Sequence, residues 1–233
     1  MKKTYQSVLV VCTRRIGDVL LATPVIRSLK AAAPHAAIDM LVFSGTEDVV
    51  TANPDIRHVW TVPPRASVRE SLTMLSQIWR RYDLGVSVLP GDRPVFYAWA
   101  AGRHSVATVT PERKSWWKRL LLDGQESFDN HDTHTVVMNL RLLRLLEVDA
   151  IATPVVTWAS EDEMAARSVF PGMAGSERYA VLHVTPKFVY KAWTASGWAM
   201  LGRWIRNCGV KVVVVGGTSP DERVTVSRIL DGL

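Results

Sequence analysis

Apolar and polar residues form two different patterns along the first 150 residues. Short runs rich in β-branched residues, such as Ser7 to Cys12, are typical of strands buried on both faces of a parallel sheet. From Gly17 and Asp18 onward the apolar positions recur at helical spacing, which predicts a helix. Further strands are predicted at 37–42, 58–62 and 84–89, and further helices at 47–52, 67–81 and 95–101. This alternation predicts an α/β fold with a doubly wound parallel sheet.

The second part of the chain repeats the order of strand, loop and helix. Residues 151–160 show no helical period and are predicted to link a domain over 1–150 to a second one over 161–233. Helices are predicted at 161–169 and 194–208, and strands, the first of them buried, at 179–184 and 210–215. Two strands alone leave an exposed sheet edge, so we expect instability or self-association of this part.

The turn from Thr13 to Asp18 lies at the carboxyl end of the first predicted strand, where open α/β sheets bind ligands. Gly17 is expected to let the backbone turn tightly. Asp18 stands at the predicted start of the helix, where it could cap the helix or act as a catalytic base. The turn lacks the GxGxxG spacing, which argues against a dinucleotide site.

A second polar loop, Pro90 to Pro94, follows the predicted strand at 84–89 at the same edge of the sheet. Asp92 and Arg93 bring one carboxylate and one planar cation to the predicted cleft. Either they contact a ligand, or they are turn residues, with Asp92 accepting a local backbone hydrogen bond.

The positive charge of the chain is concentrated in one segment. The 233 residues carry a formal net charge of +6. Residues 60–122 hold ten Lys or Arg against four acids, which accounts for the whole excess. Such a segment fits a phosphorylated glycolipid, an anionic membrane or nucleic acid, or it is simply a solvated surface. Within it, Arg113 to Arg119 interleaves four cations with Trp116 and Trp117, a pattern that suits lipid phosphates or stacking on bases, or packing beneath a surface loop.

Other chemical signals are weak. Cys12 and Cys208 are expected to be reduced structural thiols, since no CxxC spacing accompanies them. His131 and His134 have a spacing that a metal could use, but without a third ligand nearby packing at the start of a helix is favoured. No apolar run reaches the roughly 18 residues of a membrane span, and no signal-peptide cleavage site is visible. The cytoplasm is the expected location.

Three segments resemble one enzyme family. The pattern RxGDxLLxTPxIRxLK, over Arg15 to Lys30, is similar to the opening of glycosyltransferase family 9, the ADP-heptose:lipopolysaccharide heptosyltransferases. LHVTP(x4)KxW, followed by VVVVGG(x3)DE, resembles the start of that family's donor domain, and HTVVMNLRLLRLL at 134–146 also matches. The resemblance implies a GT-B fold: two Rossmann-like domains with both substrates in the cleft between them. Because family members continue for roughly half a domain more, the second domain is expected to be incomplete.

The resemblance also implies an activity. Family members transfer a heptose from ADP-heptose to a lipopolysaccharide core acceptor, inverting the anomeric centre, without metal or cofactor. Carried onto this chain, Asp18 is the general base, Thr185 and Lys191 hold the diphosphate, and Glu222 binds the ribose hydroxyls. The acceptor-binding residues would be Arg14, Arg15, Asp92 and Arg93.

The implied partners are an ADP-sugar donor and a lipopolysaccharide core or other anionic glycolipid as acceptor, with peripheral contact at the inner face of the inner membrane. Nucleic acid is not expected, because the chain lacks a helix-turn-helix, zinc or RNP pattern. The alternative function is a truncated, non-catalytic module that binds anionic glycolipid.

Overall fold

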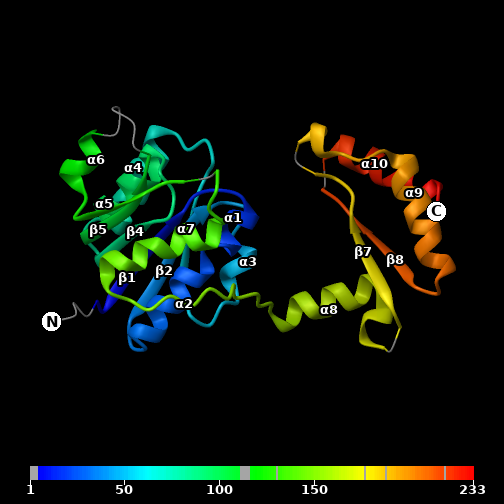
Figure 1. Cartoon of the computed structure of the whole chain (residues 1–233), viewed down its shortest axis with the longest axis horizontal. Coiled ribbons are helices and arrows are strands. Elements are labelled where there is room, and N and C mark those ends of the chain that lie inside the picture. The colour runs from blue at the N-terminus through cyan, green and yellow to red at the C-terminus, as the bar shows by residue number, and fades with distance from the viewer. Residues whose placement is uncertain (1–4, 111–115, 130, 176, 187, 218) are drawn as a thin grey trace. The chain divides into compact units, whose positions relative to one another are not determined.

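The computed structural model describes residues 5–110, 116–129, 131–175, 177–186, 188–217 and 219–233 (Figure 1). Arg113 and Lys114 of the basic segment lie outside these described residues. The chain divides into two compact units, Met1–Trp158 and Ala159–Leu233. Every helix among the described residues is too short or too polar to cross a lipid bilayer.

The first unit contains a six-stranded sheet in which every neighbouring pair of strands is parallel. The strand order is β3-β2-β1-β4-β5-β6, so β1 lies between β2 and β4, with Val8 opposite both Ile38 and Leu84. The strands are β1 (Ser7–Cys12), β2 (Ala37–Phe43), β3 (His58–Val62), β4 (Tyr82–Ser87), β5 (Gly102–Val109) and β6 (Gly124–Ser127). The order reverses beside β1, which is the point where doubly wound sheets bind ligands.

Helices cover both faces of this sheet. They are α1 (Ile16–Leu20), α2 (Thr23–Ala32), α3 (Asp48–Thr51), α4 (Val68–Ile78), α5 (Asp92–Ala101), α6 (Trp116–Leu121), α7 (Thr135–Arg141) and the 3-10 helix η2 (Leu142–Leu146). Val8 and Val10 of β1 pack with α1, α2 and α7, whereas Leu9 and Val11 pack with α4 and α5. Alternate residues of one strand therefore enter two separate cores, which confirms the predicted doubly wound sheet.

The first predicted helix is in fact two helices. The first, α1, ends at Leu20, and α2 starts at Thr23, followed by Pro24. Proline has no N–H to donate to the carbonyl four residues earlier, so it interrupts the helical hydrogen bonds. Two strands, β5 and β6, were not predicted. Gly102, predicted only as a helix stop, is also the first residue of β5.

The second unit contains a two-stranded parallel sheet with helices on one face. Its elements are α8 (Ser160–Val169), η3 (Pro171–Ala174), β7 (Tyr179–His183), η4 (Val189–Lys191), α9 (Ala195–Asn207), β8 (Lys211–Val215) and α10 (Pro220–Asp231). Leu182 packs with Ile229 of α10 and Trp198 of α9. On the opposite face Val181 is 55% exposed. The prediction of a fully buried strand is therefore wrong, because among the described residues the helices cover one face of the sheet.

Candidate functional site

Asp18 lies in the first turn of α1, directly after β1 and its connecting turn. The N-cap position belongs to Arg15, and no side chain caps this helix, so the interpretation of Asp18 as a helix cap is wrong. Gly17 lies within α1 without a positive φ, so the expected need for glycine in a tight turn is also wrong. The Asp18 carboxylate is 28% exposed, with Oδ2 3.7 Å from Arg14 Nε. The structure thus presents a carboxylate beside a cation at the carboxyl edge of the sheet.

A pocket of about 160 Å³ opens at this carboxylate. Its lining includes Asp18 and Arg14 from the α1 turn, Leu89 from the segment after β4, and Asn139 from α7. Cys12 forms part of the wall. Burial raises the pKa of the Cys12 thiol, and the charge of Asp18 raises it further, against a smaller opposing effect of Arg14. The thiol therefore stays protonated and unreactive, as expected for a structural cysteine.

The loop between β6 and α7 contributes a second carboxylate, which sequence reasoning missed. Asp129 accepts hydrogen bonds from the His131 N–H (3.0 Å), the Asp132 N–H (3.3 Å) and the Thr133 hydroxyl (2.5 Å). The Thr133 hydroxyl and the backbone N–H groups lower the pKa of Asp129. Asp129 and Thr133 both line the pocket with Asp18.

The structure also shows what His134, one of the two histidines after Asp129, does. Nδ1 of His134 accepts the Val136 N–H at the start of α7. His134 thus stabilises the beginning of this helix by capping it, and not by the predicted packing, because its side chain is exposed.

Asp92 and Arg93 stand at the start of α5, and among the described residues neither lines the pocket of Asp18. Arg93 donates through Nη1 to the Pro64 carbonyl (3.0 Å) and through Nη2 to the Pro63 carbonyl (2.9 Å). Oδ1 of Asp92 lies 2.8 Å from Lys118 Nζ. Both side chains therefore tie the start of α5 to neighbouring segments.

Lys118 was expected to be a solvated or phosphate-binding cation, but it is buried. Its side chain is only 3% exposed. Nζ donates to the Pro90 carbonyl (2.6 Å) as well as contacting Asp92. Trp117 also faces inward, against Val95 and Leu122. The outer surface of α6 instead presents Trp116, Arg119 and Leu120.

The second unit brings two of the predicted donor residues together. Thr185, which follows β7 and is buried, accepts the Gly217 N–H at 2.9 Å. Glu222 forms a capping box with Ser219 at the start of α10, and a Cβ at Gly217 would overlap its carboxylate. The hydroxyl and backbone N–H of Ser219 lower the pKa of Glu222, with a further hydrogen bond involving Thr185. Thr185, Gly217 and Glu222 thus form one polar loop cluster.

Lys191 ends the short helix η4, in the segment that follows Thr185. Its Nζ lies 5.6 Å from the ring centre of Phe188 and 5.7 Å from that of Tyr190. Its side chain is exposed and makes no salt bridge with a carboxylate of the described part of the chain. Its ammonium therefore remains accessible to an anion.

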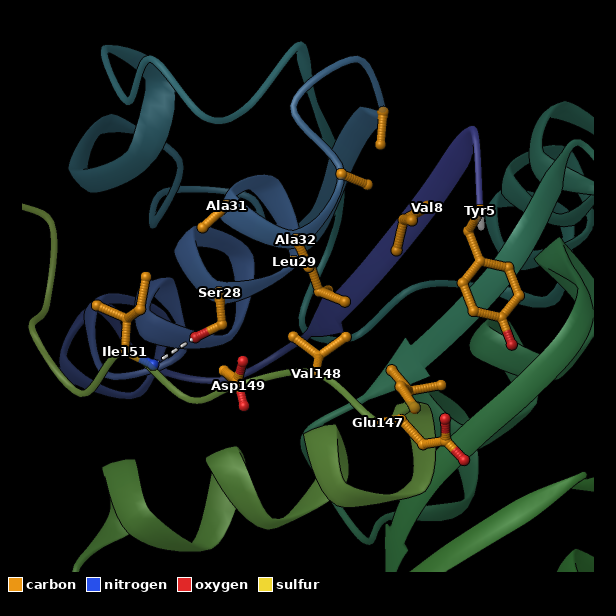
Figure 2. A pocket seen from close by; sticks show the side chains of 13 residues that line it. Tyr5, Val8, Ser28, Leu29, Ala31, Ala32, Glu147, Val148, Asp149 and Ile151 are labelled. Atoms are coloured by element: carbon orange, nitrogen blue, oxygen red, sulfur yellow. Dashed lines mark hydrogen bonds between the residues drawn. The ribbon is translucent and has the colours of Figure 1, made fainter. Parts of the chain in front are cut away.

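A cavity of about 370 Å³ lies at the other edge of the first sheet (Figure 2). Its lining comes from the amino end of β1, including Tyr5 and Val8, from α2 and from residues 146–151. None of the predicted site residues lines it. The carboxyl edge with Asp18 is therefore the candidate site of this unit.

Comparison with curated proteins shows which proteins this chain is similar to. No family model matches the chain. Lipopolysaccharide heptosyltransferase 3 of Escherichia coli (strain K12) is 23% identical over 239 residues, and the protein of the same name from Escherichia coli is 24% identical over 234 residues. Each match covers 93% of this chain. The chain is similar to these lipopolysaccharide heptosyltransferases. It spans 64% and 65% of the length of these two relatives.

Solved structures share the fold. The glycosyl transferase family 9 structure from Veillonella parvula DSM 2008 matches with a TM-score of 0.82 and 20% identity, over 99% of this chain and 67% of that one. The E. coli heptosyltransferase WaaC with ADP matches with a TM-score of 0.74 and 17% identity, over 97% of this chain and 71% of that one. The GT-B fold class that the sequence motifs predict is confirmed.

The structure distributes the predicted site residues over both units. It joins Arg14 to Asp18 in one pocket and Thr185 to Glu222 in one loop cluster, whereas Asp92 and Arg93 have partners outside that pocket. Arg15, at the N-cap of α1, is exposed. The pocket residues that sequence reasoning missed, Asp129, Thr133 and Asn139, follow β6, a strand that was itself not predicted. Their chain positions alone gave no reason to place them near Asp18.

Proposed function

We propose that this chain is a glycosyltransferase that moves a heptose from ADP-heptose to a lipopolysaccharide core acceptor, with inversion and without metal. The similarity to curated heptosyltransferases along 93% of the chain is the observation that carries the proposal. In the reaction, an acceptor hydroxyl attacks the anomeric carbon, the bond from that carbon to the β-phosphate oxygen breaks, and ADP leaves.

Asp18 takes the proton of the acceptor hydroxyl. A carboxylate suits this role when a hydroxyl can reach it. Asp18 is partly exposed at a polar pocket, and Arg14 Nε lies 3.7 Å from its Oδ2. Arg14, Arg15, Asp92 and Arg93 are proposed to contact the acceptor. Arg93 can do so only with those of its N–H groups that the Pro63 and Pro64 carbonyls leave unused, because both terminal nitrogens already donate there.

Thr185, Lys191 and Glu222 bind the donor. The accessible ammonium of Lys191 suits a diphosphate and offsets the charge that develops on departing ADP. The hydroxyl of Thr185 donates to a phosphate oxygen by turning its single proton away from Glu222. The carboxylate of Glu222, kept ionised by its Ser219 hydrogen bonds, can accept hydrogen bonds from ribose hydroxyls.

Calorimetric titration with ADP and with ADP-heptose, in buffer containing EDTA, tests the donor site. We expect saturable binding of both, weakened at least about tenfold in Lys191→Ala and in Thr185→Val, because each variant removes a group that meets the diphosphate. Thr225→Val is the matched control, since its hydroxyl bonds the Asp221 carbonyl on the exposed side of α10. Absence of binding by the folded chain contradicts the donor site and favours a module that binds anionic glycolipid without catalysis.

We also propose that the protein works in the cytoplasm, in peripheral contact with the inner face of the inner membrane through α6. Trp116 is 65% exposed and Leu120 75% exposed, and Arg119 lies on the same side of the helix. Indole rings favour the membrane interface, and arginine favours lipid phosphates.

Sedimentation with vesicles tests this contact. The chain is expected to sediment with vesicles that contain anionic lipid and to stay in solution with neutral ones. Trp116→Ser combined with Leu120→Ser reduces the bound fraction several-fold, because it removes the apolar part of the contact. Val68→Ser combined with Leu72→Ser, on the exposed side of α4, is the control. An equal loss in both double variants argues against a contact specific to α6.

A further inference from the structure

At the break between α1 and α2, a side chain replaces a missing backbone hydrogen bond. Because Pro24 has no N–H, it cannot give the Leu20 carbonyl its helical hydrogen bond. The hydroxyl of Thr23 donates to that carbonyl instead, at 2.7 Å. Asn139 Nδ2 donates to the next carbonyl, that of Leu21, at 3.1 Å. The end of the helix that carries Asp18 is thus held by side-chain groups.

The same hydroxyl also binds a distant part of the chain. Residues 148–155, called here the strap, form neither helix nor strand and run along α2 (Figure 2). The strap is fixed by two buried hydroxyls of α2. Ser28 accepts the Ile151 N–H at 2.8 Å, and Thr23 accepts the Val155 N–H at 2.9 Å. Both hydroxyl side chains are completely buried.

Thr23 and Ser28 differ in what else they touch. Ser28 donates to the Pro24 carbonyl inside α2, so it links the strap to α2 alone. Thr23 donates to Leu20, the last residue of α1 and two positions after Asp18. The Thr23 hydroxyl therefore donates a hydrogen bond to the helix that carries Asp18 and accepts one from the strap.

We propose that Thr23 is a positioning residue for Asp18. Its hydroxyl couples the strap to α1 and thereby fixes the direction of the Asp18 carboxylate at its pocket. The inference rests on the proposed role of Asp18 as base. It assigns a function to a buried threonine that touches neither substrate.

Hydrogen exchange of the full chain tests the coupling without any need for activity. Thr23→Val keeps the shape of the side chain and removes the hydroxyl. It is expected to speed exchange of the Val155 amide, and of the Val19 and Leu21 amides that bond within the α1 turn, by at least about tenfold. Ser28→Ala is the matched control, which frees the Ile151 amide and leaves those of α1 unchanged. Thr23→Ser restores the pattern of the native chain. Thr23→Ala serves if the valine variant does not fold.

Steady-state kinetics then separates positioning from folding. Thr23→Val lowers kcat about tenfold or more with little change in KM for donor and acceptor, because a displaced base weakens the chemical step rather than binding. Thr23→Ser recovers kcat, and Ser28→Ala keeps it. If the α1 amides exchange no faster in Thr23→Val, the coupling is wrong even when transfer is observed. If they do and the native chain shows no transfer, the proposed function fails while the coupling stands. Faster α1 exchange with unchanged kcat refutes the positioning role.

Discussion

Replacing Asp18 with asparagine lowers kcat for heptose transfer by at least about 100-fold, the range in which a general base contributes. Asparagine keeps the shape of the side chain and its position in the first turn of α1 but cannot take a proton at neutral pH. ADP binding, for which we propose Thr185 and Lys191 in the other unit, is expected to remain at the level of the native chain. The readout is ADP formation with ADP-heptose and a core acceptor that lacks the heptose.

The matched control is Asp48→Asn, which changes an exposed aspartate in the first turn of α3. It removes the same charge from the first turn of another helix and should leave kcat unchanged. Transfer by Asp18→Asn at the rate of the native chain would exclude the base role. An equal loss in both variants would point to net charge rather than to the carboxylate at the pocket.

Replacing Asp39 with asparagine lowers the free energy of unfolding by about 2 kcal/mol, because it breaks a buried ion pair. Asp39 is almost completely buried and receives two hydrogen bonds from Arg57, at 2.9 and 2.7 Å, and one from the Tyr82 hydroxyl at 2.6 Å. Arg57 is half-exposed, so water can solvate its guanidinium once the Asp39 charge is gone. The loss of stability therefore stays moderate. Denaturant unfolding followed by circular dichroism measures the effect. Asp55→Asn, in the loop before β3, should change stability by no more than about 0.5 kcal/mol.

The same ion pair predicts a dependence on pH. Burial alone would raise the pKa of Asp39, but the hydrogen bonds from Arg57 and Tyr82 outweigh it and lower the pKa below its usual value. The stabilisation is therefore complete above the unfolded-state pKa of about 3.9 and is lost as the pH falls through the lower folded-state pKa. Stability of the native chain should fall more steeply below pH 4 than that of Asp39→Asn. Parallel curves for the two proteins would contradict this contribution.

Hydrophobic periodicity predicted the first four strands and the helices between them because each of these strands is a short apolar run bounded by turn residues. It failed where tertiary contacts decide the structure. The sequence of β6, Gly124–Ser127, has little apolar character, and β6 exists because it pairs with β5 at the sheet edge. The break at Leu21 was missed because the apolar spacing continues across it, although Pro24 was a visible signal.

The candidate site was predictable to the extent that it follows a strand end. Asp18 and Thr185 could be placed because each comes directly after a predicted strand and within a family motif. The pocket partner Asp129 could not, since only the fold brings the loop after β6 to the end of β1. For Lys118 the prediction from sequence is wrong. Its neighbours in the sequence indicate a solvated basic segment, but its ammonium is buried, where it donates to the Pro90 carbonyl and contacts Asp92.

Acceptor-dependent release of ADP by the native chain is the measurement that tests the central claim, heptose transfer, most directly. With ADP-heptose at saturation, we predict that ADP forms when a heptose-deficient lipopolysaccharide core is added, one ADP for each heptose transferred, and that little forms without the core. No ADP above the background rate, from a folded chain that binds both ligands, would contradict catalysis and leave a glycolipid-binding module as the function.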